Sequence, residues 1–434
     1  MTKVVVFSAH LGLDSAAEVR VFGACAVSAR LDVGNHTEER LDVGNDAEER
    51  TDQVKEYTPA ELVDRGSVKW TTFPGTLGAF IAEADFGTAP CVHDALEELT
   101  AKELFTYAPQ AMHAEARQAT AEFHARRYGW DISPGDIDFA PDVLSALLAT
   151  LDLFSPPEAP VVLLTPAYMP FFTAPATRDR VVREVPLIRT SDAWEIDFDA
   201  LDAALEPGAV FLHCNPHNPV GKVYTCAEHE RIAELIEKND ARVFSDEIHA
   251  QLVFDGQQHV PYATVSEAAG RHTITATSCS KAFNIPGLKC AQVLFTNPEH
   301  RDVYRDRARF VSGAAANPGL VATTAAYRDG DEWLGRFIDY LDGNRKLMAE
   351  LVDRHLPQAS YLVPQGTYIA WLDLRAYGIG EDAAAFLREH AKVALTNGQE
   401  CGRVGAGCVR VNMATTSAIL TEIVERVAKA CQPH

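Results

Sequence analysis

From Pro59 onward the chain alternates short apolar runs with longer amphipathic stretches, and no other feature of the sequence restricts the fold as strongly. The short runs have the length of buried strands, and the stretches between them carry apolar residues at helical spacing. Strands separated by helices form a mainly parallel sheet with both faces covered, so the sequence predicts an α/β fold. The expected strands are 161–164, 209–212, 241–244 and 291–294, and the expected helices are 111–128 and 227–238.

The final third of the chain predicts a second, smaller α+β unit, with a helix over 333–354, a strand over 367–374 and a helix over 417–430. We expect residues 101–325 to form the large domain, residues 326–434 the small domain, and residues 61–100 an N-terminal segment of the small domain. Residues 31–40, LDVGNHTEER, are followed by the near-copy LDVGNDAEER, which is acidic and lacks core-forming periodicity. We interpret residues 1–60 as an acidic, partly disordered extension.

Charge and cysteine usage argue against several classes of partner. A formal net charge of −22 without a basic patch disfavours nucleic acid and anionic membrane surfaces. The N-terminus is too broken for a signal peptide, and no run of about 18 apolar residues occurs. Nine cysteines without repeated spacing favour reduced thiols and a cytoplasmic location. Cys401 and Cys408 have no histidine at finger spacing beside them, so we expect no metal site.

The segment TATSCSKAFNIPGLKCA, residues 275–291, carries the strongest chemical signal. Ser278 precedes Lys281 by three residues, and Lys289 follows it by eight. A buried lysine amine can form a Schiff base with an aldehyde, and a hydroxyl with a second cation suits a phosphate dianion. A surface loop with two ordinary lysines is the alternative for this segment taken alone.

A second signal is the carboxylate of Asp246 in VFSDEIHAQLVF, residues 243–254. The apolar run before it predicts a strand that delivers the carboxylate to the C-terminal edge of the sheet, where open α/β sheets bind their ligands. A carboxylate there can keep a pyridinium nitrogen protonated, which makes the ring an electron sink. By itself, Asp246 could equally be a helix cap.

Three motifs in one order make the chain similar to a known family: N-P-x-N-P-x-G at 215–221, S-D-E-I-H at 245–249 and S-x-S-K-A-F-N-x-x-G-L-K at 278–289. They resemble the pyridoxal 5'-phosphate (PLP) dependent enzymes of fold type I, specifically the cystathionine β-lyase-like (cysteine-S-conjugate β-lyase) branch of the class I and II aminotransferases. The resemblance extends over nearly all of residues 65–430. It implies the aspartate-aminotransferase-like fold, PLP as the cofactor and an amino acid as the substrate.

The resemblance also implies roles for single residues. Lys281 would be the Schiff-base lysine, Asp246 the partner of the pyridine nitrogen, and Asn218 a hydrogen-bond donor to the phenolic oxygen of the cofactor. His249 stands where many relatives carry a tyrosine directed at that oxygen, and a histidine is typical of the lyase branch. A core histidine satisfied by backbone is the alternative for this position.

Four further residues would complete the cofactor site. Ser278 and Lys289 would hold the phosphate. Tyr168, in LLTPAYMPFF, would stack on the ring, with simple packing beside the sheet as its alternative. Tyr107, in LFTYAPQ, matches a tyrosine that reaches the phosphate of the neighbouring subunit, which implies a homodimer with shared active sites. Arg410, in GAGCVRVNMA, matches the arginine that binds the substrate carboxylate with two parallel hydrogen bonds.

The chain departs from the family pattern at two places around this site. The pocket wall, usually like MWVADMDF, is AFIAEADF at 79–86, so Phe80, Glu83 and Ala84 rebuild the substrate side. The phosphate-binding turn, usually T-P-G-V, contains Asp142 instead of glycine. We expect the Asp142 side chain to turn away from the phosphate and cap its own helix, while backbone N–H groups from Val143 on serve the phosphate.

Three functions remain open from the sequence. The leading hypothesis is a carbon–sulfur β-lyase that releases pyruvate, ammonia and a thiol from a cysteine S-conjugate or a cystathionine-like amino acid. The second is an aminotransferase, which needs the same electron sink; the His249 context favours elimination. The third, a non-catalytic PLP-binding regulator, would require a DNA-binding module, and the acidic N-terminus has no helix-turn-helix pattern.

Overall fold

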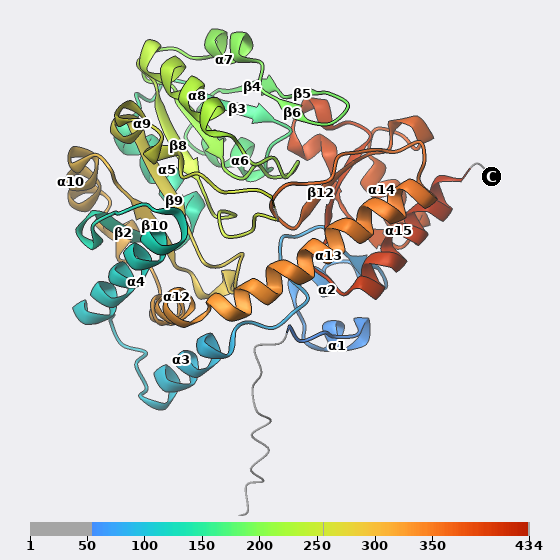
Figure 1. The fold of residues 1–434 in the computed structure, drawn as a ribbon, viewed down its shortest axis with the longest axis horizontal. Coiled ribbons are helices and arrows are strands. Elements are labelled where there is room, and N and C mark those ends of the chain that lie inside the picture. Colours follow the sequence, from blue (N-terminus) through green and yellow to red (C-terminus); the bar gives the residue numbers. More distant parts are fainter. Residues whose placement is uncertain (1–53, 255, 433–434) are drawn as a thin grey trace, which may run out of the picture. The chain divides into compact units, whose positions relative to one another are not determined.

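The structure is a computed structural model that describes residues 54–254 and 256–432 (Figure 1). The duplication at 31–50 lies outside these residues. The larger of two main sheets has seven strands in the order β2-β10-β9-β8-β7-β3-β4. Its strands are β2 (Ile137–Ala140), β3 (Val161–Thr165), β4 (Val182–Pro186), β7 (Val210–Cys214), β8 (Arg242–Asp246), β9 (Thr273–Thr277) and β10 (Ala291–Leu294).

The mainly parallel sheet predicted from the sequence is confirmed. Strands β4, β3, β7, β8 and β9 pair in parallel, whereas β10 is antiparallel to both β9 and β2. Two strands run two residues beyond their predicted ends, to Cys214 and Asp246, which pair with each other across β7 and β8. The apolar pattern stopped earlier because polar side chains at a strand end still leave the backbone ladder intact. This extension brings both side chains to the same edge of the sheet.

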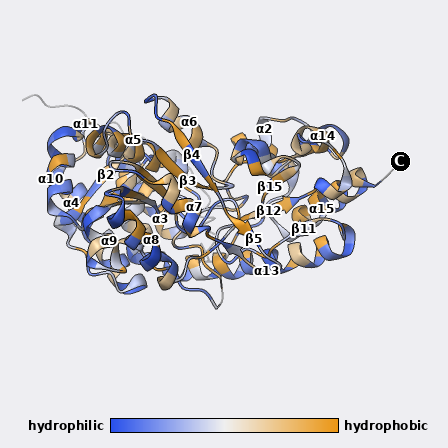
Figure 2. Cartoon of the chain, turned by 90° about the horizontal axis from the view of Figure 1, so that it is seen from above, coloured by the Kyte–Doolittle hydropathy of each residue, from blue (hydrophilic) through white to orange (hydrophobic). Residues whose placement is uncertain are grey.

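Helices cover the sheet, and their ends follow local capping chemistry. Helix α4 ends at Gly129, whose φ of +66° closes the helix in the left-handed region. Helix α8 begins at a reciprocal capping box between Thr225 and Glu228. Figure 2 shows apolar residues concentrated on β3 and β4 and polar residues on α8. The helices of this part are α3 (Pro90–Ala101), α4 (Gln110–Tyr128), α5 (Val143–Phe154), α6 (Pro170–Ala176), α7 (Phe198–Ala204), α8 (Cys226–Lys238), α9 (Glu267–His272), α10 (Pro298–Arg307), α11 (Arg309–Ser312) and α12 (Asn317–Asp329).

The second main sheet has four antiparallel strands in the order β11-β12-β15-β14. They are β11 (Ser360–Tyr361), β12 (Ile369–Asp373), β14 (Thr396–Asn397) and β15 (Cys408–Asn412). The associated helices are α1 (Pro59–Asp64), α2 (Val68–Thr71), α13 (Asp331–His355), α14 (Ala383–His390) and α15 (Ser417–Cys431). The short pairs β1 (Leu77–Gly78) with β13 (Val393–Ala394), and β5 (Ile188–Arg189) with β6 (Trp194–Glu195), complete the strands.

The long helix α13 contributes to two hydrophobic cores. Phe337 and Leu341 pack with Phe86 beneath the first sheet's helices, and Met348 and Leu351 pack against the second sheet. These apolar residues recur at three- and four-residue spacing on one helical face, so a single stripe serves both cores. In Figure 1 this helix runs as one continuous rod past α12 toward α15.

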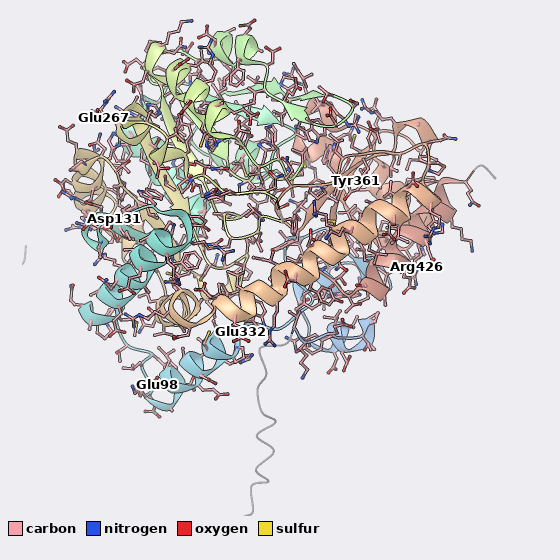
Figure 3. All side chains as sticks on the ribbon, viewed as in Figure 1. Glu98, Asp131, Glu267, Glu332, Tyr361 and Arg426 are labelled. Carbon is pink, nitrogen blue, oxygen red and sulfur yellow. The ribbon has the colours of Figure 1, made fainter. Side chains whose placement is uncertain are left out.

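The segment expected to join the small domain, residues 61–100, divides its contacts. Trp70 and Leu77 pack in the core of the second sheet, and β1 pairs with β13. Helix α3, in contrast, packs against α12, which lies inside the range that we assigned to the large domain. Charged side chains such as Glu98, Glu267 and Glu332 lie on the outer faces of α3, α9 and α13 (Figure 3). Within the described residues, no helix combines the length and the hydropathy needed to cross a membrane.

Candidate active site

A cavity of about 220 Å³ lies where β3, β7, β8 and β9 end. Parallel strands present their carboxyl ends at one edge of a sheet, which is why segments far apart in the sequence converge there. Eight of the ten predicted site residues line this cavity, and Tyr107 and Arg410 are the two that do not. The eight are Val143, Tyr168, Asn218, Asp246, His249, Ser278, Lys281 and Lys289.

The Lys281 amine is buried in the cavity wall and donates a hydrogen bond of 2.9 Å to the carbonyl oxygen of Ala82. Burial and the nearby positive charge of Arg410 lower the pKa of Lys281 to about 8. An amine with this pKa is partly neutral near pH 8 or just below it, as a nucleophile or a base must be. The alternative, an ordinary surface lysine, does not describe this side chain.

Asp246 ends β8 and is only 4% exposed. Burial raises the pKa of its carboxyl to about 7. The carboxyl accepts a hydrogen bond of 3.1 Å from the backbone N–H of Ile248, within a turn. No helix begins after Asp246 in the described chain before Tyr262, so the helix-cap alternative for this residue is wrong. A buried carboxyl without a fixed counter-ion is available to a cationic group in the cavity.

The sequence analysis missed two features next to Asp246. Cys214, its neighbour across the ladder, also lines the cavity, and the matching strand-end positions of FLHC and VFSD could have revealed it. Glu247 points elsewhere and forms a buried pair with His259, at 3.0 Å between Oε2 and Nε2. Glu247 also accepts hydrogen bonds from Ser245 Oγ at 2.8 Å and Tyr262 N at 3.0 Å. These bonds fix the loop that follows β8, although no sequence spacing linked Glu247 to His259.

Two side chains flank the middle of the cavity. The His249 imidazole is buried, and its Nδ1 has no hydrogen-bond partner. Burial, then the charges of Lys281 and Arg410, lower the pKa of His249 to about 3, so the ring is neutral. The alternative of a histidine satisfied by backbone does not hold for that nitrogen. Tyr168 lines the cavity and packs edge-on against Phe171, with ring centroids 5.3 Å apart.

The end of the cavity that we assigned to a phosphate is built from Ser278, Lys289 and the first turn of α5. Ser278 Oγ donates to the Cys290 carbonyl at 2.8 Å and accepts from Ser280 N at 3.1 Å. The first turn of α5, from Val143 on, faces this end and presents backbone N–H groups that an α-helix leaves without intrahelical partners. This donor set, opposite the Asp246 carboxyl, fits a ring that carries a basic nitrogen at one end and a phosphate at the other.

Our expectation for Asp142 was half right. Its Oδ1 caps α5 by accepting a hydrogen bond of 2.8 Å from Ser145 N, as predicted. The side chain does not turn away from the phosphate end, however: Asp142 lines the cavity, and its Oδ2 lies 3.1 Å from Lys289 Nζ. The correction has a physical reason, because a carboxylate and an ammonium within reach of each other pair.

Arg410 lies on β15 and is 2% exposed. Its guanidinium donates to the Phe80 carbonyl at 2.7 Å, to Asn218 Oδ1 at 3.3 Å and to Thr396 Oγ1 at 3.3 Å. Among the residues that the structure describes, no carboxylate forms an ion pair with Arg410. A buried cation that contacts only neutral groups is stabilised when an anion binds beside it.

The pocket wall at 79–86 is held from several sides. The Ala82 carbonyl accepts from both Lys281 Nζ at 2.9 Å and Tyr368 OH at 3.0 Å. Farther along, buried Lys69 pairs with Asp85 at 2.8 Å and also donates to the Glu83 carbonyl. The rebuilt segment is therefore a fixed wall rather than a loose loop.

Tyr107 lies between α3 and α4 with 99% of its side chain exposed, and nearby Phe105 is 68% exposed. Within one chain it adds nothing to the cavity. Its predicted contact with a neighbouring subunit stays a prediction.

A family model described as aminotransferase class I and II matches residues 80–427. Together with the sheet order and the lysine and aspartate in its edge cavity, this match shows that the chain belongs to the class I and II aminotransferase family, with the fold of type I. The cystathionine β-lyase of Corynebacterium glutamicum is 35% identical over 370 residues, which cover 85% of this chain and 97% of that protein.

Two solved structures extend the comparison. One from Corynebacterium diphtheriae, assigned in its description to PLP-dependent β-cystathionase, has a TM-score of 0.83 and 37% identity, and the match covers 88% of this chain and 100% of that one. Cystalysin from Treponema denticola, described as containing PLP, has a TM-score of 0.81 and 27% identity over 87% of this chain and 97% of its own. The predicted family and fold are confirmed.

Proposed function

We propose that this chain is a PLP-dependent carbon–sulfur β-lyase that acts on a cysteine S-conjugate or a cystathionine-like amino acid. The observation that carries the proposal is the single cavity in which a buried amine of lowered pKa, Lys281, accompanies a buried carboxyl, Asp246. The cystathionine β-lyase relative supports elimination as the reaction. The reduced-thiol cysteine composition supports a cytoplasmic location.

When bound, PLP supplies the electron sink for the negative charge left on Cα after its proton is removed. Lys281 is the base for that proton, because its pKa of about 8 leaves part of the amine neutral under ordinary conditions. Asp246 keeps the ring nitrogen of the cofactor protonated, since a cation beside the carboxyl favours the charged form of both. The products of the whole reaction with water are pyruvate, ammonia and a thiol.

Arg410 binds the substrate carboxylate in this proposal. Its guanidinium is buried without an anionic partner among the described residues and touches Asn218, which itself lines the cavity. Planar guanidinium–carboxylate pairing with two parallel hydrogen bonds would fix the orientation of the amino acid. Asn218 then has two neighbours, the arginine and the cofactor oxygen that it is proposed to contact.

The rebuilt wall supports a bulky sulfur conjugate as the substrate. Ala84 is smaller than the methionine usual in this branch, and Phe80 packs edge-on against Phe73 at 5.1 Å, which places an aromatic pair near Arg410. A smaller side chain and a fixed aromatic surface favour an apolar leaving group. Screening S-conjugates of increasing size tests this point, and activity confined to cystathionine would contradict it.

Transamination is the second candidate, because the family as a whole is described as aminotransferases. Both reactions start with removal of the same Cα proton, so Lys281 and Asp246 do not separate them. The difference lies in where the charge goes next, either to the β-sulfur or back to a proton on the cofactor carbon.

A product assay separates these functions. With an S-alkylcysteine, we expect pyruvate, ammonia and thiol in equal amounts, while the absorption of the bound cofactor returns to its starting form after each turnover. Lys281→Ala protein serves as the control for spontaneous breakdown. A stable change of the cofactor to its amine form, without added keto acid and without pyruvate, would establish transamination instead.

We also propose a homodimer with shared active sites, supported by the almost complete exposure of Tyr107. Tyr107→Ala is expected to weaken PLP binding on the order of tenfold, as loss of one hydrogen bond to a charged group does. Mixed dimers of Tyr107→Ala and Lys281→Ala chains should regain activity, because one of the two sites then receives both native residues. Unchanged PLP affinity in Tyr107→Ala, or no gain on mixing, would refute sharing.

A further inference from the structure

Asp142 places a negative charge inside the end of the cavity that suits a phosphate. Its Oδ2 lies 3.1 Å from Lys289 Nζ, and both residues line the cavity. Lys289 is the only ammonium group among the described cavity-lining residues apart from Lys281. The cation available to an incoming phosphate is thus already paired with a carboxylate of the chain.

The position of Asp142 is fixed rather than accidental. Its other oxygen, Oδ1, caps α5 through Ser145 N at 2.8 Å and also accepts from Ser145 Oγ at 2.7 Å. Burial acts to raise the pKa of Asp142, but the hydrogen bonds from Ser145 and the pair with Lys289 outweigh it and hold the pKa below its ordinary value. The carboxylate therefore stays charged at neutral pH and cannot leave without giving up a helix cap.

We propose that Asp142 competes with the phosphate of the cofactor for Lys289, so that this chain binds PLP more weakly than its cradle would otherwise allow. A phosphate dianion must break the ion pair or share the lysine with a like charge, and either event costs free energy. The inference rests on the proposed function, because it assumes that PLP is the molecule bound. It makes Asp142 a determinant of how much of the enzyme carries cofactor at a given PLP supply.

The test compares PLP with pyridoxal, which lacks the phosphate. Asp142→Asn removes the charge and keeps the cap, since asparagine caps helices as well as aspartate does. We expect the dissociation constant of PLP from the apoprotein, measured by absorbance or fluorescence titration, to fall on the order of tenfold. The dissociation constant of pyridoxal should stay within about twofold, and the gain for PLP should shrink as salt is raised.

Two control variants match this substitution. Asp197→Asn makes the same change at the N-cap of α7, where Asp197 accepts from Ala200 N at 2.9 Å outside the cavity, and should alter neither constant. Ser145→Ala removes the hydroxyl bond to Asp142 but leaves its charge, so no gain is expected. Equal or weaker PLP binding by Asp142→Asn would overturn the inference, as would an equal gain for pyridoxal. Failure of the wild-type protein to bind either compound would instead refute the proposed function.

Discussion

Replacing Lys281 with alanine is expected to lower kcat/KM for β-elimination by at least about four orders of magnitude. Lys281 is proposed to bond the aldehyde of the cofactor and to remove the Cα proton, and no other amine lies close enough among the described residues of the cavity except Lys289, which is paired with Asp142. Borohydride treatment followed by peptide mapping should place the reduced cofactor on Lys281 in the wild type and on no lysine in the variant.

The fold should survive this change. Lys281 is a buried amine whose charged form is disfavoured, so its removal leaves no unpaired partner charge. The Ala82 carbonyl keeps its hydrogen bond from Tyr368 OH at 3.0 Å. A matched control is Lys238→Ala on α8, whose lysine pairs with Asp202 at the surface and should be dispensable. A small primary amine added to Lys281→Ala should restore part of the rate by acting as the base. Retention of borohydride-stable cofactor in Lys281→Ala would sink the assignment.

Asp246→Asn is expected to lower kcat/KM by about three orders of magnitude and to weaken PLP binding. The amide keeps the size of the side chain but cannot hold a positive charge on the ring nitrogen, so the electron sink is lost. Wild-type activity in Asp246→Asn, measured as pyruvate release at saturating PLP, would contradict the proposed role.

The same substitution should stabilise the apoprotein. Burial raises the pKa of Asp246 from 3.8 to about 7, so the folded state holds the proton more tightly than the unfolded chain does. The resulting destabilisation is absent below the unfolded pKa, grows as pH rises toward the folded pKa and is complete above it, where it reaches roughly 4 kcal/mol. Asparagine has no charge to bury and escapes it.

This argument gives the second half of the Asp246 prediction its sign. The Tm of apo Asp246→Asn should exceed that of the apo wild type, and by more at about pH 8 than at about pH 5.5. Addition of PLP should reverse the order, because only the wild type gains the ion pair with the ring nitrogen. A variant that is less stable than the wild type at both pH values would show that Asp246 serves a structural role.

Several parts of the site followed from the sequence because they depend on segments that carry their own signals. The apolar runs before Cys214 and Asp246 predicted strand ends, and parallel pairing places such ends at one edge. The motif around Lys281 named both the amine and the phosphate ligands Ser278 and Lys289 before any contact was known. All of these residues do line one cavity.

Other parts depend on side chains that meet from distant segments. Arg410 was predicted as a substrate ligand, but its lack of an anionic partner is visible only in the folded chain. Asp142 was expected to turn away, and the structure pairs it with Lys289, 147 residues later in the chain. The pair of Glu247 with His259 has no sequence signal, because neither residue's neighbours differ from those of an ordinary loop.

The sequence by itself determined the alternation of strand and helix, the family motifs and the identity of the groups able to do the chemistry, because periodicity and local motifs are properties of neighbouring residues. Only the tertiary structure decided which charges face one another and how water is excluded from them. Burial and proximity set the pKa values of Lys281 and Asp246, and both arise when remote segments pack together.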